Sequence, residues 1–218
     1  MNILYQDESI FAINKPSGLL TIRDGYNPDL PTVKSILESE FGRCWIVHRL
    51  DKETSGILLV ARNEAAHRML SMSFENHQIQ KIYHAIINGI PSAKDFLINL
   101  PLKIDGDRKH RTIVDQVHGK SAKSNVQVLK SYEKYSLVSI KPESGYTHQI
   151  RTHLSFFGYP ILGDKLYQKP KYPLTELIGR TALHAYQITF MNPLTNAPMT
   201  IQAGYPEDFQ KTLTALSL

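Results

Sequence analysis

The sequence predicts an α+β fold, in which a mixed, largely antiparallel β-sheet is flanked by helices. Most of the expected strands arrive as neighbouring pairs joined by short turns, rather than alternating strictly with helices. Segments with helical apolar spacing are few, and residues that cap or break helices bound them. The chain contains no repeat, low-complexity tract or linker rich in Pro, Gly or Ser. We therefore expect a single domain over residues 1–218.

The first half of the chain is expected to contain three strands and two helices. Short apolar runs bounded by turn residues predict the strands, and a Thr or Asn before an apolar run predicts the start of each helix. In chain order, we expect strands at 3–5 and 10–14, a helix from a cap at Thr32 to about Phe41, a strand at 57–61, and a helix from a cap at Asn63 through Phe74.

The second half is expected to be richer in strands. Its glycines and prolines lie between the apolar runs, where they end one element before the next begins. We expect strands at 81–89, 97–102, 124–132 and 135–141, a helix that Gly145 and Thr147 open and that Gly158 and Pro160 end, a strand pair at 183–190 and 198–203, and a terminal helix at 207–216.

Composition excludes several classes of protein. The chain has 218 residues, of which 42% are hydrophobic and 21% are charged, as in ordinary globular domains. No apolar run approaches the roughly 18 residues that a membrane span requires, and the first residues lack the basic start of a secretion signal. The single cysteine, Cys44, excludes an internal disulfide. It suits a reducing compartment, so we expect a cytoplasmic protein without a membrane partner.

Positive charge is concentrated in one segment. The formal net charge is +5, and residues 103–130 carry an excess of basic side chains. This basic segment is interpreted either as a solvated pair of strands with a loop, or as a phosphate-contacting surface whose binding weakens with salt. Its basic residues are Lys103, Arg108, Lys109, Arg111, Lys120, Lys123 and Lys130, offset by Asp105, Asp107 and Asp115.

The most informative stretch is residues 48–56, which read His-Arg-Leu-Asp-Lys-Glu-Thr-Ser-Gly and precede the strand expected at 57–61. Asp51 lies between Arg49 and Lys52 at the edge of a core strand, so we expect its carboxylate to stay ionised and to be held rigidly. Such a carboxylate suits a nucleophile or a general base. An ordinary solvated loop has the same pattern, so spacing alone leaves both interpretations open.

Three further segments complete a recognisable pattern. Residues 14–18 read Asn-Lys-Pro-Ser-Gly, residues 81–89 read Lys-Ile-Tyr-His-Ala-Ile-Ile-Asn-Gly, and residues 145–151 read Gly-Tyr-Thr-His-Gln-Ile-Arg and continue to Gly163-Asp164. In this order and spacing, the four segments resemble the RluA-like branch of the RNA pseudouridine synthases, from about residue 3 to residue 190. The resemblance implies a catalytic α+β domain that converts uridine in RNA to pseudouridine.

The resemblance also implies roles for individual residues. Asp51 matches the family's essential catalytic Asp, and Arg49 matches the Arg that enters the base stack as the target nucleotide leaves it. Tyr83 matches an active-site Tyr, which we expect to stack on uracil and to assist removal of the C5 proton. Arg151 matches the Arg that pairs with the catalytic carboxylate. The other expected substrate contacts are His48, Lys15, Leu183 and His184.

The implied reaction involves no redox change or group transfer, so we expect no cofactor. The sequence shows no Gly-rich phosphate loop, no Cys pair and no convincing metal cluster. His148 and His153 lie five residues apart, off the spacing for two metal ligands on one helix face, and are interpreted as packing or hydrogen-bonding residues.

Two features depart from the family's pattern. Tyr146 occupies a position where the family usually has Arg or Lys, so one candidate phosphate contact is missing. The first motif begins at Asn14, so the small N-terminal RNA-binding domain of many relatives is not expected before it. Target choice would then come from the catalytic domain itself, with a monomer as the expected state.

Several functions stay open at this point. Branch membership favours ribosomal RNA as the substrate, and transfer RNA is the alternative. An RNA-binding or ribosome-assembly factor on the same fold is a rival of another class, although Asp51, Tyr83 and Arg151 together favour an enzyme. A carboxylate-dependent sugar hydrolase would need a second catalytic acid, and Glu53 is too close along the chain to face Asp51 across a substrate.

Overall fold

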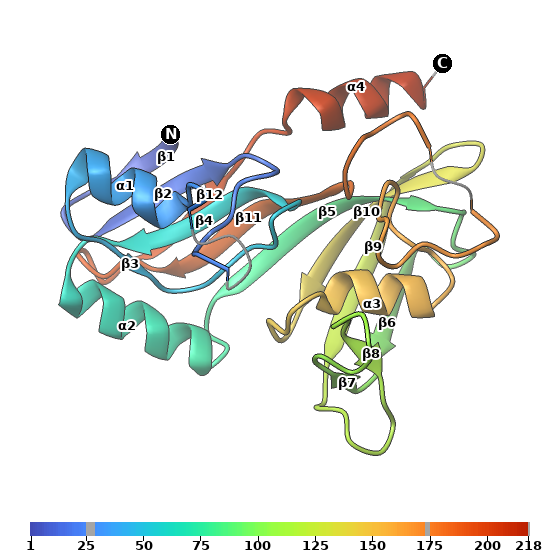
Figure 1. The fold of residues 1–218 in the computed structure, drawn as a ribbon, viewed down its shortest axis with the longest axis horizontal. Helices are drawn as coiled ribbons and strands as arrows, with labels where there is room; N and C mark the ends of the chain where they lie inside the picture. Colours follow the sequence, from blue (N-terminus) through green and yellow to red (C-terminus); the bar gives the residue numbers. More distant parts are fainter. Residues whose placement is uncertain (25–28, 173–174, 218) are drawn as a thin grey trace. The chain divides into compact units, whose positions relative to one another are not determined.

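The computed structural model describes residues 1–24, 29–172 and 175–217, and Figure 1 shows the course of the chain. The chain divides into two compact units. The first comprises Met1–Lys81 and Ala185–Tyr205, and the second comprises Ile82–His184 and Pro206–Leu218. Helices and mostly antiparallel strands occur in both units, which confirms the α+β class. Among the described residues, no helix is both long enough and apolar enough to cross a membrane.

The first unit combines antiparallel strands with two helices. Its elements are β1 (Asn2–Gln6), β2 (Ile10–Lys15), α1 (Val33–Phe41), β3 (Trp45–Ile46), β4 (Ser55–Ala61), α2 (Glu64–Glu75), β11 (Leu183–Met191) and β12 (Pro198–Gln202). The strand order is β1-β2-β4-β11, with β3 paired to β4 and β12 paired to β11. Both expected helix caps are confirmed, because Thr32 and Asn63 each accept a hydrogen bond from a backbone N–H three residues later.

The core of the first unit lies between these strands and α2. Ile10 and Ala12 of β2, with Ile57 and Leu59 of β4, present the apolar face of the sheet. Leu70 of α2 packs into the same cluster and is completely buried. All seven residues of β4 are buried, as expected for a strand in the middle of a sheet. The 48–56 motif is therefore anchored to the most buried strand of this unit.

The second unit contains a four-stranded sheet, a short strand pair and two helices. Its elements are β5 (Gln80–Asn88), β6 (Asp95–Asn99), β7 (Leu102–Lys103), β8 (Ile113–Val114), β9 (Lys123–Ser131), β10 (Tyr135–Pro142), α3 (Gln149–Phe156) and α4 (Glu207–Ala215). The sheet order is β5-β10-β9-β6, and β7 pairs with β8. Helix α3 contacts β8 and β10, and its first seven residues are all buried.

The structure differs from the sequence prediction at three places. The strand expected at 97–102 is divided into β6 and β7, and the two-residue strands β3 and β8 are too short to produce a period-2 pattern. Helix α3 begins at Gln149 rather than near Thr147. The reason is that His148 has a left-handed backbone, with φ 56°, which a helix cannot include.

Candidate active site

Asp51 lies in a tight turn at the entrance to β4. The Thr54 N–H donates to the Asp51 carbonyl at 3.1 Å and closes the turn. Leu50, directly before it, is buried, and its backbone N–H and C=O both bond to the Thr21 hydroxyl, at 3.2 and 3.0 Å. The Asp51 side chain is half-buried. The backbone that carries this carboxylate is therefore fixed on both sides.

The segment that follows β2 braces the same turn. The Lys15 ammonium is completely buried and donates to the carbonyls of Pro16 (2.9 Å), Leu19 (2.8 Å) and Lys52 (3.2 Å). The Gly18 N–H donates to the same Lys52 carbonyl at 2.8 Å. The three hydrogen bonds of this buried ammonium support the turn. The substrate contact expected of Lys15 stays a prediction.

Strand β4 approaches β11 so closely that only glycine fits at position 56. Gly56 has φ +111°, and a Cβ at this position would lie 2.3–2.8 Å from the backbone of Ala185. Carbon atoms in ordinary contact are about 3.5–4.0 Å apart. The last residue of the 48–56 motif is therefore determined by backbone packing.

His48, the first residue of the 48–56 motif, forms a hydrogen bond with strand β4. Its Nε2 accepts a hydrogen bond from the Leu59 N–H at 2.9 Å, so the ring carries its hydrogen on Nδ1. The ring stacks on Phe74 with 4.5 Å between the centroids. Burial, helped by the charge of Lys81, lowers the pKa of His48 to about 3. His48 is therefore a neutral residue that holds the motif in place, and its expected substrate contact stays a prediction.

Arg49 is the exposed cation beside Asp51. Its side chain faces solvent, and within the described ranges it forms no hydrogen bond or ion pair. Lys52, three residues later, is also exposed. The turn thus presents two exposed positive charges on a backbone held by hydrogen bonds.

Arg151 lies in the first turn of α3 and forms a buried ion pair with Asp164. Its Nε donates to Asp164 Oδ2 at 2.7 Å, and its Nη2 donates to Oδ1 at 2.8 Å. Only 9% of the Arg151 side chain and none of the Asp164 side chain is exposed. Sequence reasoning assigned no role to Asp164, although the Gly163-Asp164 pair at the end of the fourth segment was the available signal.

Tyr83, Leu183 and His184 also have defined surroundings in the second unit. Tyr83 is half-buried in β5, opposite Ile140 of β10. Leu183 and His184 are buried at the start of β11. Burial, helped by the charge of His184, lowers the pKa of His84 to about 4. His84 and His184 are therefore core residues. The substrate contacts expected of Leu183 and His184 stay predictions.

The candidate catalytic residues are divided between the two units. Asp51 belongs to the first unit, whereas Tyr83 and Arg151 belong to the second. The contact expected between Asp51 and Arg151 stays a prediction.

His148, which precedes α3, and His153, which lies within it, form hydrogen bonds, as expected. His148 Nδ1 lies 3.1 Å from the Tyr167 hydroxyl. His153 is completely buried, with Nδ1 2.9 Å from Ser124 Oγ and Nε2 3.0 Å from the Leu100 carbonyl. Among the residues that the structure describes, no group of three His, Cys, Asp or Glu side chains is placed to hold a metal ion.

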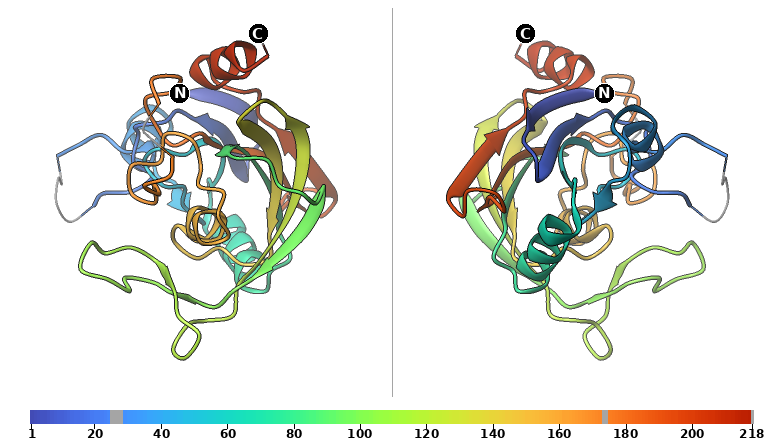
Figure 2. Two further views of the ribbon diagram at one scale, coloured as in Figure 1. Left: turned by 90° about the vertical axis from the view of Figure 1, so that its right-hand side faces the viewer. Right: turned by 90° about the vertical axis from the view of Figure 1, so that its left-hand side faces the viewer.

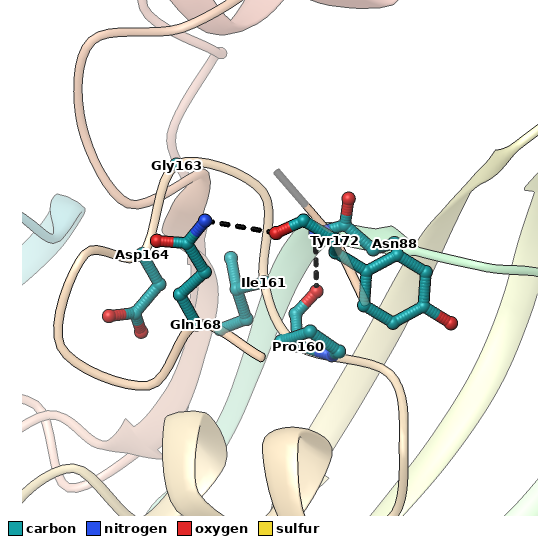
Figure 3. Close-up of a pocket in the computed structure, with 7 residues that line it drawn as sticks. All are labelled: Asn88, Pro160, Ile161, Gly163, Asp164, Gln168 and Tyr172. Carbon is teal, nitrogen blue, oxygen red and sulfur yellow. Dashed lines mark hydrogen bonds between the residues drawn. The ribbon is translucent and has the colours of Figure 1, made fainter. Parts of the chain in front are cut away.

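A small pocket lies against the loop that carries Asp164, as Figure 3 shows. The Asn88 side chain donates to the Pro160 carbonyl at 3.0 Å, and the Gln168 side chain donates to the Tyr172 carbonyl at 2.9 Å. The first bond joins the loop to β5, and the second lies within the loop. The lining residues are Asn88, Pro160, Ile161, Gly163, Asp164, Gln168 and Tyr172.

Residues 103–122 of the basic segment form β8 and the loops around β7 and β8, which project from the second unit (Figure 2), and residues 123–130 lie in β9. Some of its cations are neutralised, since Arg111 pairs with Asp107 at 2.7 Å and Lys103 pairs with Asp115 at 3.9 Å. Other side chains are exposed and form no hydrogen bond or ion pair with any described residue. These are Arg108, Lys109 and Lys120.

The proteins that this chain is similar to in sequence are RNA pseudouridine synthases. A sequence model described as RNA pseudouridylate synthase matches residues 9–156. The chain is 36% identical over 204 residues to the dual-specificity RNA pseudouridine synthase RluA of Haemophilus influenzae, covering 93% of this chain and 92% of the relative. It is 31% identical over 236 residues to the ribosomal large subunit pseudouridine synthase D of Neisseria meningitidis. That match covers all of this chain but only 62% of the relative.

A solved structure gives the same result. The chain is 25% identical to human RNA Pseudouridylate Synthase Domain Containing 4, with a TM-score of 0.80, and the match covers 99% of this chain and 93% of the human one. Residues 9–156, which the sequence model matches, include both the turn at 48–56 and helix α3.

Proposed function

The chain belongs to the RNA pseudouridylate synthase family, and from this premise we propose that it is an isomerase that converts specific uridines of structured RNA to pseudouridine. The observation that carries the proposal is the braced turn at Asp51, which lies inside the family match and holds a carboxylate at the end of the most buried strand. A nucleophile must be held in place in this way, because positioning supplies much of the rate.

The proposed reaction balances without any other reactant. The bond from ribose C1′ to uracil N1 breaks, the base turns, and a bond from C1′ to C5 forms. The C5 hydrogen leaves as a proton, and N1 gains one. Asp51 acts as the nucleophile, at either C1′ or C6, because carboxylates serve as nucleophiles at sugar carbons. No electron or group is transferred, so no cofactor or metal is required.

Arg151 and Tyr83 complete the proposed catalytic set. A guanidinium beside Asp51 would stabilise the charged carboxylate and fix its rotamer, and Arg151 is the candidate. Tyr83 combines an aromatic ring, which can stack on uracil, with a hydroxyl that can help to remove the C5 proton. Its half-buried position in β5 supports this role, because a fully buried ring could not meet a base.

We propose that ribosomal RNA is the favoured substrate and that the protein acts as a cytoplasmic monomer. The relative from Neisseria, which is named for the ribosomal large subunit, supports this choice. Transfer RNA is the second candidate, because the relative from Haemophilus is named as a dual-specificity enzyme. The test is tritium release from ribosomal and transfer RNA transcripts labelled at uracil C5. Release from neither class would contradict the proposal.

Arg49→Ala is expected to impair nucleotide flipping. A uridine in a stem must leave the stack, at a cost of a few kcal/mol, and the exposed guanidinium of Arg49 can fill the vacated space. Single-turnover rates should fall about tenfold or more on a structured substrate but little on an unstructured one. Lys52→Ala, which removes the other exposed cation of this turn, is the matched control. An equal loss on both substrates would exclude the flipping role.

Replacement of Lys109 and Lys120 by Gln is expected to weaken RNA binding. It should also make the binding constant less dependent on salt concentration. Both ammonium groups are exposed and form no ion pair with any residue that the structure describes. If each contacts one phosphate, the slope of log K against log salt should decrease by about two. The control replaces Lys34 and Lys211, which are ion-paired on helices with Glu38 and Glu207. An unchanged slope in the first variant would mean that the basic segment is only a solvated surface.

A further inference from the structure

We propose that Asp164 is a positioning residue, which holds the Arg151 guanidinium in the orientation that the reaction needs. The inference rests on the proposed function and extends it to a residue outside the expected catalytic set. Every contact that carries it lies within the second unit. In the proposed reaction, Arg151 is the group that would meet the reacting carboxylate, and Asp164 would act through it.

The ion pair fixes one edge of the guanidinium. Nε and Nη2 of Arg151 donate to the two carboxylate oxygens of Asp164, at 2.7 and 2.8 Å. Such a bidentate pair fixes both the plane and the direction of the guanidinium, which a single hydrogen bond does not. A guanidinium has five N–H groups, so the fork that binds Asp164 can also bind a second carboxylate along another edge.

Asp164 is itself held firmly. Its Oδ1 accepts hydrogen bonds from the backbone N–H groups of Leu166 and Tyr167, at 3.0 and 3.1 Å. Gly163, before it, has φ +73°, and a Cβ at this position would lie 2.1 Å from the Arg180 carbonyl. The carboxylate therefore sits on a tight turn that no larger residue could form at this place.

The Arg151 guanidinium also lies over an aromatic ring. The Arg151 Cζ lies 5.1 Å from the centroid of the Tyr167 ring. The Tyr167 hydroxyl in turn donates to the Thr112 carbonyl at 3.0 Å and accepts from the Thr112 N–H at 2.9 Å. Asp164 thus restricts Arg151 along one edge, and the Tyr167 ring provides a second contact.

Stability is a weak explanation for this arrangement. A buried ion pair often contributes no more than well-packed apolar residues would, because two charges must be desolvated. What the pair does supply is direction for a group that the proposed reaction uses. A pair of the same bidentate geometry, with a half-exposed carboxylate, occurs elsewhere in this unit, where Arg180 Nε and Nη2 donate to Asp208 at 2.6 and 2.9 Å. That second pair provides a matched control.

Asp164→Asn is the decisive variant. An amide has one oxygen, so in either orientation its NH₂ group faces an N–H donor of Arg151 or of the turn. We expect kcat for tritium release from uridine-labelled ribosomal RNA transcripts to fall about a hundredfold, as for a misplacement of roughly 1 Å, with KM unchanged. Asp208→Asn removes a pair of the same geometry and should leave kcat unchanged. Thermal melts of both variants establish that each is folded during the assay.

A double variant separates positioning from an independent effect. If Asp164 acts through Arg151, then Asp164→Asn with Arg151→Met should be no slower than Arg151→Met alone. Multiplied losses, or an Asp164→Asn variant as fast as Asp208→Asn, would overturn the inference while leaving the proposed function intact. If Asp164→Asn does not fold, Asp164→Ser keeps an acceptor for the turn and removes the bidentate contact. Absence of tritium release by the unaltered protein would instead contradict the proposed function.

Discussion

Asp51→Asn is expected to abolish tritium release from RNA labelled at uracil C5, with a loss of at least about 10³-fold. The amide has the shape of the carboxylate but cannot act as an anionic nucleophile. The turn should remain intact, because the amide keeps the shape of the side chain and the bonds of the Thr54 N–H, the Leu50 backbone and the Thr21 hydroxyl are unchanged. RNA binding, measured by filter retention, should therefore be largely retained.

Glu53→Gln is the matched control for this variant. Glu53 lies in the same turn and is also half-buried, but it has no role in the proposed reaction. We expect Glu53→Gln to release tritium at the rate of the unaltered protein. If the two variants lost activity equally, the enzyme would need a pair of carboxylates, as a sugar hydrolase does. Full activity of Asp51→Asn would exclude Asp51 as the nucleophile.

Gly56→Ala is expected to lower the free energy of unfolding of the first unit by about 3 kcal/mol or more. The new methyl group would overlap the Ala185 backbone, and alanine at φ +111° is strained as well. Urea unfolding followed by tryptophan fluorescence measures this directly. Trp45 is the only tryptophan of the chain, and it lies in β3, opposite Ala61 of β4.

Gly42→Ala separates the two causes of this loss. Gly42 also has a positive φ, of +80°, but a Cβ there would meet nothing within 4 Å. Its replacement should cost only the backbone strain, about 1 kcal/mol. If Gly56→Ala were no less stable than Gly42→Ala, β4 and β11 would be able to separate without cost, and the close approach at Ala185 would not be essential.

The sequence predicted the regular elements well, since local signals determine them. Thr32 and Asn63 cap helices as expected, and the strands with strong apolar runs, such as 57–61, are present. The two-residue strands β3 and β8 were missed, because they depend on partners distant in the chain. The start of α3 was misplaced because the left-handed backbone of His148 has no signal in its residue type.

The candidate site was predicted less completely than the fold. The motifs identified the turn at Asp51 and the helix that carries Arg151, and the structure places both. The burial of the Lys15 ammonium by three carbonyls could not be predicted from a Lys-Pro pair, and the substrate contact expected of Lys15 stays a prediction. The partnership of Arg151 with Asp164 was missed, because it joins positions 13 residues apart through a turn of unusual geometry.

The buried ammonium of Lys15 has a consequence for how such a protein can diversify during evolution. Its hydrogen bonds, with those of Gly18 and Thr21, join the turn to other residues of the first unit. The exposed cations Lys109 and Lys120 lie on loops of the second unit. Substitutions in those loops therefore replace none of the residues that brace the turn at Asp51. Under the proposed function, a lineage could change its RNA contacts while it keeps these bracing residues.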